Sequence, residues 1–213
     1  MKKINLCGGD ALPLAQTLLF ATPSSGDTPQ RPVICVTGKM AAGKNYFCSL
    51  LEKQGWKTVD LDILVHQAIK EQTPVILKTF ADTAEKENIC LENADGTLNR
   101  RELGKLVFSN PQLLKKQEDI VYPAVIQLTK KFISNNSEFP VVINATVLYK
   151  TPELMSLCTK IAFITAPFFT RLKRAKKRDK MPVKQILKRF WSQRTLLKEY
   201  KNTGKEILLI INK

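Results

Sequence analysis

The chain has 213 residues, of which 44% are hydrophobic, so it can form one sizeable core, and this argues against a disordered protein. Its formal net charge of +15 predicts anionic partners such as nucleotides, phosphorylated coenzymes, nucleic acid or an acidic membrane surface. The single histidine and five widely spaced cysteines argue against a histidine metal cage or a disulfide framework, and they favour core thiols in a reducing, cytoplasmic setting.

Residues 1–31 are predicted to be an N-terminal extension and linker. Two lysines followed by an apolar stretch over 11–21 resemble a signal peptide, but polar residues interrupt that stretch and it is too short to span a bilayer. We therefore expect a short helix or a frayed end, a linker rich in proline and serine, and neither export nor membrane association.

A phosphate-binding loop is predicted after the apolar run at 33–36. Two glycines five residues apart allow the backbone N–H groups to turn inward at the start of a helix over 46–53, where the helix dipole favours an anion. A plain strand-turn-helix is the alternative interpretation. The predicted ATP-binding residues are Gly38, Lys39, Met40, Ala41, Ala42, Gly43, Lys44, Asn45 and Tyr46, with Lys44 on the outer phosphates.

Asn45 occupies the position where such loops usually carry a serine or threonine that binds magnesium. Its amide oxygen is a suitable hard ligand but lies farther from the backbone, and magnesium tolerates little deviation from octahedral geometry. We expect either a shifted or water-mediated contact to Mg²⁺, or weakened metal binding.

A second strand is predicted over 57–60, followed by a helix over 63–70. If Asp60 and Asp62 both continue the strand, their carboxylates point the same way, beside the phosphate loop at the carboxyl end of a parallel sheet. The alternative is that Asp62 only caps the following helix.

Residues 63–135 are predicted to be a helical insertion. Prolines stand at plausible helix starts, Asp95 begins a tight turn, and a long amphipathic run covers 113–132. Arg100 and Arg101 follow that turn at a helix start, where they form either surface ion pairs of little energetic value or a site for a substrate phosphate.

Three further apolar runs, at 140–145, 160–165 and 208–212, are typical of buried parallel strands, and 152–157 suits a crossover helix. The segment 168–201 is strongly basic, with Asp179 and Glu199 as its only acidic residues. We interpret it as a lid that folds over a polyphosphate, the alternative being a solvated basic face.

These elements predict an α/β protein of the P-loop NTPase type. About five parallel strands flanked by helices form a kinase core over 32–213, with the helical insertion as substrate domain and the basic segment as lid.

The order of motifs over residues 33–212 resembles the dephospho-CoA kinase family. After the phosphate loop and Asp60-Leu61-Asp62, the most specific motifs are Asp95-Gly96-Thr97-Leu98-Asn99-Arg100-Arg101-Glu102-Leu103, Phe108-Ser109-Asn110-Pro111 and Gln193. Members of that family transfer the γ-phosphoryl group of ATP to the ribose 3′-hydroxyl of dephospho-CoA, the last step of coenzyme A synthesis.

The resemblance implies ATP and Mg²⁺ as cofactors, dephospho-CoA as substrate, and a monomer or small homo-oligomer. Lys44, Asp62 and Arg178 would be catalytic, with Asp62 as base, and Arg174 would bind ATP from the lid. The implied substrate-binding residues are Asp60, Asp62, Asp95, Arg100 and Arg101.

Four positions differ from the family pattern: Asn45, His66 where an arginine is common, Tyr122 where a histidine is usual, and Lys150 where a glutamate is expected. Together they predict slow turnover or altered metal use. The alternatives are another small-molecule or nucleotide kinase on the same scaffold and a pseudokinase that binds nucleotide without turnover. Nucleic-acid binding by the basic segment is not expected, because it contains few aromatic residues for base stacking.

Overall fold

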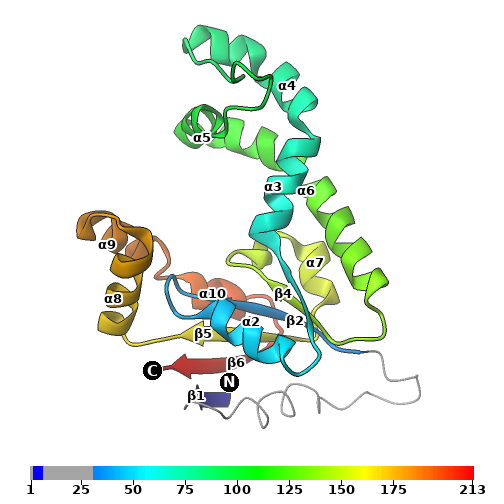
Figure 1. The fold of residues 1–213 in the computed structure, drawn as a ribbon, viewed down its shortest axis with the longest axis vertical. Helices are drawn as coiled ribbons and strands as arrows, with labels where there is room; N and C mark the ends of the chain where they lie inside the picture. Colours follow the sequence, from blue (N-terminus) through cyan, green and yellow to red (C-terminus); the bar gives the residue numbers. More distant parts are fainter. Residues whose placement is uncertain (1, 7–30) are drawn as a thin grey trace. The chain divides into compact units, whose positions relative to one another are not determined.

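The computed structural model describes residues 2–6 and 31–213, which form two compact units (Figure 1). Leu61–Lys131 make up one unit, and the described residues before and after this segment make up the other.

The first unit is built on a sheet of six parallel strands in the order β1-β6-β5-β2-β4-β3. The strands are β1 (Lys2–Leu6), β2 (Val33–Gly38), β3 (Lys57–Asp60), β4 (Val141–Asn144), β5 (Lys160–Thr165) and β6 (Glu206–Asn212). Chain order reverses at β2, which pairs with β4 on one side and β5 on the other. Ligands bind at such a switch point in open α/β sheets, beyond the carboxyl ends of the strands.

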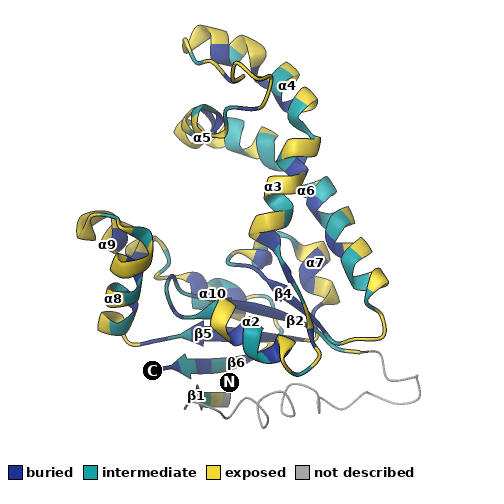
Figure 2. Ribbon diagram, viewed as in Figure 1, coloured by how far each residue is buried: buried dark blue, intermediate teal, exposed yellow. Residues whose placement is uncertain are grey.

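Both faces of this sheet are covered, which explains why its central strands are largely buried and mostly apolar (Figure 2). Phe47 and Leu51 of α2 (Lys44–Glu52) pack in one cluster with Ile34, Ala162 and other alternate strand residues. Phe163, which points to the opposite face, makes an edge-on ring contact with Tyr200 of α10 (Leu196–Lys201). The short elements η1 (Leu148–Lys150) and α7 (Pro152–Leu157) connect β4 to β5.

The prediction that residues 1–31 are only an extension and linker is wrong for Lys2–Leu6, which form the sixth strand. β1 runs parallel to β6, with Lys2 opposite Leu208 and Leu6 opposite Asn212. Leu6 is buried and Ile4 packs on the same apolar cluster, so this strand covers the edge that β6 would otherwise expose. The predicted helix or frayed end over 11–21 lies outside the described residues.

The basic segment forms α8 (Phe168–Asp179) and α9 (Val183–Ser192) before α10. Lys180 follows the last residue of α8 and terminates the helix, with a φ of 50° in the left-handed region. Ala175 of α8 and Ile186 and Phe190 of α9 form a small apolar cluster with Met40, a residue of the predicted phosphate loop. The helical pair is therefore packed against that loop.

The second unit contains α3 (Leu61–Glu71), α4 (Thr73–Lys86), α5 (Arg100–Ser109) and most of α6 (Pro111–Asn135). Pro74 and Pro111 stand at the starts of α4 and α6, as predicted, because the missing N–H of proline has no helical partner there. Buried side chains such as Ile76, Phe80 and Leu103 give this unit an apolar interior. Among the described helices of either unit, none combines the length and the apolar character needed to cross a membrane.

Candidate active site

The predicted phosphate loop lies between β2 and α2, as the strand-glycine-helix pattern indicates. Gly38 has a φ of 149°, and a Cβ atom there would overlap with the carbonyl oxygen of Ile164 on β5. Lys39 N donates to the same oxygen at 3.3 Å. Only glycine lets β2 leave the sheet this close to its neighbour.

The loop ends at Gly43, whose left-handed φ of 97° starts α2. Within the described part of the chain no side chain caps this helix, and its first turn holds no acidic residue. Lys44 Nζ lies 3.5 Å from Gly38 O, so its ammonium group extends back across the loop. An uncapped helix start with a lysine beside it is suited to binding an anion.

Asn212, at the end of β6, forms a hydrogen bond to the phosphate loop. Its Nδ2 donates to Ala42 O at 2.9 Å in a buried hydrogen bond. A Cβ atom on Gly43 would overlap with that same nitrogen. The absence of a side chain at position 43 therefore makes room for Asn212 as well as for the left-handed turn.

Arg174 of α8 also lies beside Gly43, and its role in ATP binding stays a prediction. Its Nη1 is buried, has no hydrogen-bond partner within residues 2–6 and 31–213, and is 4.0 Å from the position of a Cβ atom built on Gly43. Its Nη2 donates to Lys213 O at 3.4 Å. Arg178 instead makes a bidentate pair with Asp179, at 2.6 and 3.0 Å, which lowers the pKa of that carboxyl. Its catalytic role stays a prediction.

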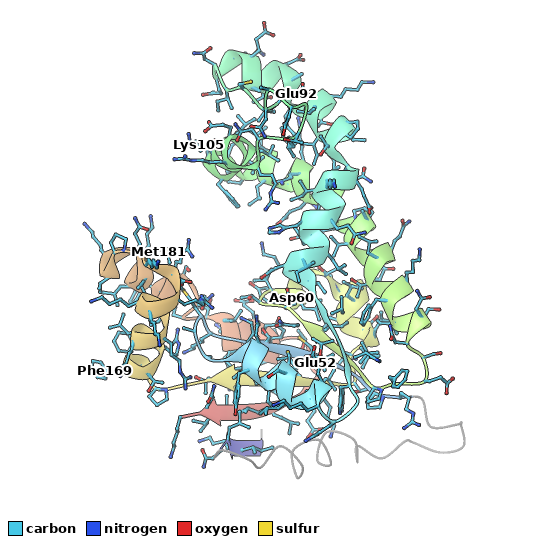
Figure 3. All side chains as sticks on the ribbon, in the orientation of Figure 1. Glu52, Asp60, Glu92, Lys105, Phe169 and Met181 are labelled. Atoms are coloured by element: carbon cyan, nitrogen blue, oxygen red, sulfur yellow. The ribbon has the colours of Figure 1, made fainter. Side chains whose placement is uncertain are left out.

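Three oxygen-bearing side chains meet at the carboxyl ends of β3 and β4 and the start of α2. Asn144 Nδ2 donates to Asn45 Oδ1 at 3.1 Å and to Asp60 Oδ2 at 3.0 Å. Asn144 is only 5% exposed, and its buried Oδ1 has no hydrogen-bond partner in the part of the chain that the structure describes. Figure 3 labels Asp60 in this group. The donor set consists of hard oxygen ligands, which Mg²⁺ prefers.

The expectation that Asp60 and Asp62 point the same way along a strand is wrong. β3 ends at Asp60, and Asp62 is an exposed residue in the first turn of α3. In a helix, residues two apart do not share a face. Asp62 belongs to the second unit, and its role as base stays a prediction.

Asp95 forms hydrogen bonds within the turn that precedes α5. Asp95 Oδ1 accepts hydrogen bonds from Thr97 N at 3.0 Å and from Thr97 Oγ1 at 2.6 Å, and these bonds lower the pKa of the carboxyl. Gly96 has a φ of 77° in the same turn. Asp95 thereby shapes the entry to α5, and direct substrate contact by this carboxylate stays a prediction.

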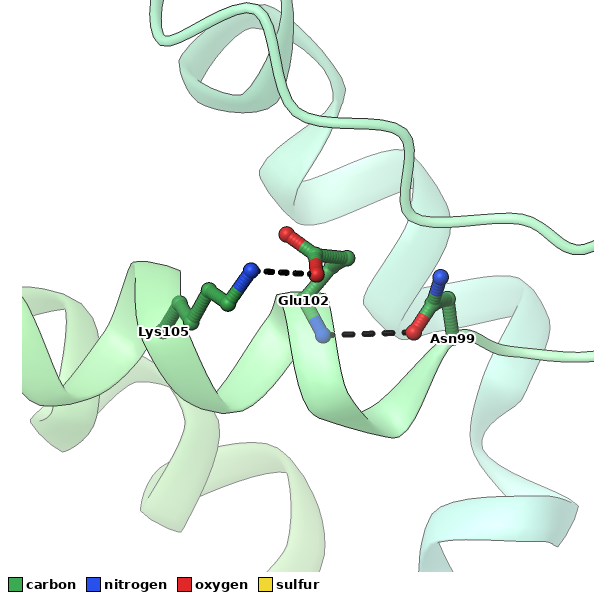
Figure 4. Close-up of polar contacts among 3 residues, drawn as sticks. All are labelled: Asn99, Glu102 and Lys105. Atoms are coloured by element: carbon green, nitrogen blue, oxygen red, sulfur yellow. Dashed lines mark hydrogen bonds and ion pairs between the residues drawn. The ribbon is translucent and has the colours of Figure 1, made fainter.

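The start of α5 is fixed by a side-chain cap. Asn99 Oδ1 accepts from Glu102 N at 3.2 Å, and Glu102 pairs with Lys105 at 2.6 Å (Figure 4). Arg100 and Arg101 are exposed in this first turn, where the helix dipole disfavours cations. No carboxylate of the described chain pairs with either guanidinium, so both are available to an anionic ligand.

The other positions that differ from the family pattern have structural partners or lie exposed. Tyr122 donates from its hydroxyl to Glu118 Oε1 at 2.9 Å within α6. Lys150 ends η1, and His66 is exposed on α3.

The sequence analysis missed two asparagines of this site, Asn144 and Asn212. Each is a polar residue at the carboxyl end of a buried apolar strand. This position in the sequence pattern could have indicated that they lie at the ligand-binding edge of the sheet.

Comparisons with known proteins identify the family of the chain. The family profile described as dephospho-CoA kinase matches residues 32–208. A dephospho-CoA kinase of Treponema denticola is 32% identical over 191 residues, which cover 87% of this chain and 85% of that protein.

Two solved structures share the fold. A Thermus thermophilus protein superposes with a TM-score of 0.71 at 24% identity, covering 86% of this chain and 90% of that one. A dephospho-CoA kinase from Campylobacter jejuni gives a TM-score of 0.56 at 23% identity, covering 86% and 89%.

Proposed function

Since the chain belongs to the dephospho-CoA kinase family, we propose that it transfers the γ-phosphoryl group of ATP to the ribose 3′-hydroxyl of dephospho-CoA. The products are coenzyme A and ADP. The observation that carries this proposal is the loop from Gly38 to Lys44, which leads into the uncapped start of α2. This loop lies within residues 32–208, which match the family profile.

ATP is proposed to bind with its β- and γ-phosphates in this loop. The backbone N–H groups at the start of α2 and the Lys44 ammonium group provide positive potential, and Arg174 adds a guanidinium beside Gly43. Phosphoryl transfer requires mainly positioning and charge neutralisation, because the transition state spreads negative charge over the γ-phosphoryl oxygens.

The residues around Asn144 fit a magnesium ion that is bound together with the nucleotide. Asn45 and Asp60 provide an amide and a carboxylate oxygen. Asn144, which donates a hydrogen bond to both, contributes a buried Oδ1 that has no partner among the described residues. Magnesium is typically held by one or two protein oxygens and the substrate phosphates, so a small donor set is sufficient. When bound, the ion would neutralise charge on the β- and γ-phosphates.

Asp62 is proposed as the base that takes the proton from the ribose 3′-hydroxyl of dephospho-CoA. In the same step the hydroxyl oxygen bonds to the γ-phosphorus of ATP, and the bond between this phosphorus and ADP breaks. The family resemblance assigns this role, and the exposure of the carboxylate in the first turn of α3 is compatible with it. Arg100 and Arg101 are proposed to bind phosphate groups of dephospho-CoA, because they are exposed cations without carboxylate partners among the described residues.

A coupled ADP-release assay with ATP, dephospho-CoA and either Mg²⁺ or Mn²⁺ tests the proposal, with the product identified by mass spectrometry. We expect ADP release that depends on dephospho-CoA and a product heavier by one phosphoryl group. Lys44→Ala is the negative control. Turnover of a nucleoside or nucleotide in place of dephospho-CoA would instead support another kinase on this scaffold, and stabilisation by ATP without turnover would support a pseudokinase.

A further inference from the structure

Met40, in the middle of the phosphate loop, is held on three sides by the segment that contains α8 and α9. Its backbone N donates to Gln193 Oε1 at 2.7 Å, and its backbone O accepts from Arg171 Nε at 2.9 Å. Its side chain belongs to the apolar cluster of Ala175, Ile186 and Phe190. Both polar groups of one loop residue are thus bound by side chains more than 130 positions later in the sequence.

Arg171 is an unusual residue to find at this position. It is 6% exposed, and its guanidinium stacks over the ring of Phe190, with 4.0 Å between the Cζ atom and the ring centroid. Its Nη2 is buried and has no hydrogen-bond partner among the described residues. Burying a cation that has no carboxylate partner in the described part of the chain, and that leaves one donor unsatisfied, opposes folding, so stability alone does not explain this arginine.

The bond that Arg171 makes acts on a strained part of the loop. Met40 O belongs to the peptide group that leads into Ala41, and Ala41 has a φ of 59°, which is unfavourable for a residue with a Cβ atom. The two hydrogen bonds hold the peptide groups on both sides of Met40 and thereby stabilise this strained conformation of the loop.

We propose that Arg171 and Gln193 are positioning residues that hold the phosphate loop in its nucleotide-binding conformation and couple it to the α8 and α9 segment. This inference rests on one part of the proposed function, the binding of ATP by the loop, and does not depend on the identity of the acceptor. It predicts that the affinity for nucleotide depends on Arg171 and Gln193, which form hydrogen bonds to the backbone of Met40 in the loop.

The test compares Arg171→Met, Arg171→Gln and Arg171→Lys with the unaltered protein. ATP and ADP binding is measured by calorimetry without an acceptor, and the thermal midpoint is measured without ligand. Arg171→Met is expected to weaken ATP binding by about tenfold, the equivalent of one hydrogen bond to a charged donor, with little loss of unliganded stability. Arg171→Gln keeps an N–H donor for Met40 O and should retain more affinity than Arg171→Met.

Lys173→Met is the matched control, because Lys173 is an exposed cation on the same helix. It should bind ATP like the unaltered protein. In the double variant Arg171→Met with Gln193→Leu, the fold-loss of ATP affinity should be smaller than the product of the fold-losses in the two single variants, since both side chains hold the same segment of the loop. In turnover assays the KM for ATP should rise while the KM for dephospho-CoA stays nearly constant.

Unchanged ATP affinity in Arg171→Met would overturn the inference. So would equal losses of ATP affinity in Arg171→Met, Arg171→Gln and Arg171→Lys, because glutamine and lysine keep an N–H donor for Met40 O and this donor would then bring no benefit. If the unaltered protein binds ATP but does not phosphorylate dephospho-CoA, the proposed function fails, and the binding data still decide this inference.

Discussion

Asn212 donates from its side-chain amide to the carbonyl oxygen of Ala42 at 2.9 Å, so the last strand of the sheet supports the phosphate loop directly. The two residues are 170 positions apart in the sequence. The bond is buried, and a loop carbonyl left without it would be unsatisfied, which makes Asn212 a sensitive position.

Asn212→Ala should therefore lower the free energy of unfolding by about 1–3 kcal/mol and raise the KM for ATP, because Ala42 O loses its buried donor. Denaturant titration and steady-state kinetics measure the two effects. Asn202→Ala, at an exposed position after α10, is the control and should change neither quantity. Equal behaviour of the two variants would show that the bond to Ala42 does not support the loop.

Gly43→Ala should be more damaging than Gly55→Ala, although both glycines have a positive φ, 97° and 88°. A Cβ atom at position 43 overlaps with Asn212 Nδ2, whereas position 55 has open space, so only the first variant adds a clash to the backbone strain. ATP binding should be lost in Gly43→Ala and kept in Gly55→Ala. Adding Asn212→Ala to Gly43→Ala should recover part of the thermal stability, and failure to do so would argue against the overlap as the cause.

Asn45→Ala should raise the Mg²⁺ concentration needed for half-maximal activity, because the amide oxygen beside Asp60 is removed. Asn45→Ser provides the shorter hydroxyl ligand and should need no more Mg²⁺ than the unaltered protein. Metal titrations at saturating ATP measure both. An identical metal requirement in all three proteins would exclude a role for position 45 in metal binding.

Asp62→Asn should reduce kcat by about 10²- to 10⁴-fold if the carboxylate is the general base, while ATP binding in the absence of acceptor remains unchanged. Asp82→Asn removes an exposed carboxylate of α4 and should leave kcat unaffected. Retention of more than about half of kcat in Asp62→Asn would assign the base role elsewhere or make it unnecessary.

The cysteines should differ in reactivity according to burial. Cys35, Cys48 and Cys158 are buried, and burial raises the pKa of the Cys48 and Cys158 thiols to about 12, whereas Cys90 is exposed. In a Cys7→Ser background, a thiol reagent at pH 8 should therefore label one site per chain, at Cys90, by peptide mapping.

The same pKa shifts predict the direction of alkaline destabilisation. A thiol that stays protonated in the folded state but ionises near pH 9 in the unfolded chain makes the unfolded state bind fewer protons, so stability falls as the pH rises from about 9 toward 12. Cys158→Ala should reduce this slope in denaturant titrations. An unchanged slope would indicate that other groups dominate.

The sequence alone determined the elements of the core and the phosphate loop. Runs such as 160–165 are apolar because both faces of a parallel sheet are covered, and the strand-glycine-helix pattern at Gly38 and Gly43 is local, so neither needs knowledge of distant contacts. The motif order also led to the correct family.

Tertiary structure alone decided which side chains support that loop. Asn144, Asn212 and Arg171 reach it from strands and a helix far along the chain, and hydrogen bonds between distant segments leave no periodic pattern in a sequence. β1 escaped prediction for a related reason: a five-residue strand at a sheet edge is too short for its alternation to stand out, and its stability comes from pairing with β6 at the other end of the chain. Local chemistry fixes which segment can bind phosphate, and long-range packing fixes the shape in which it does so.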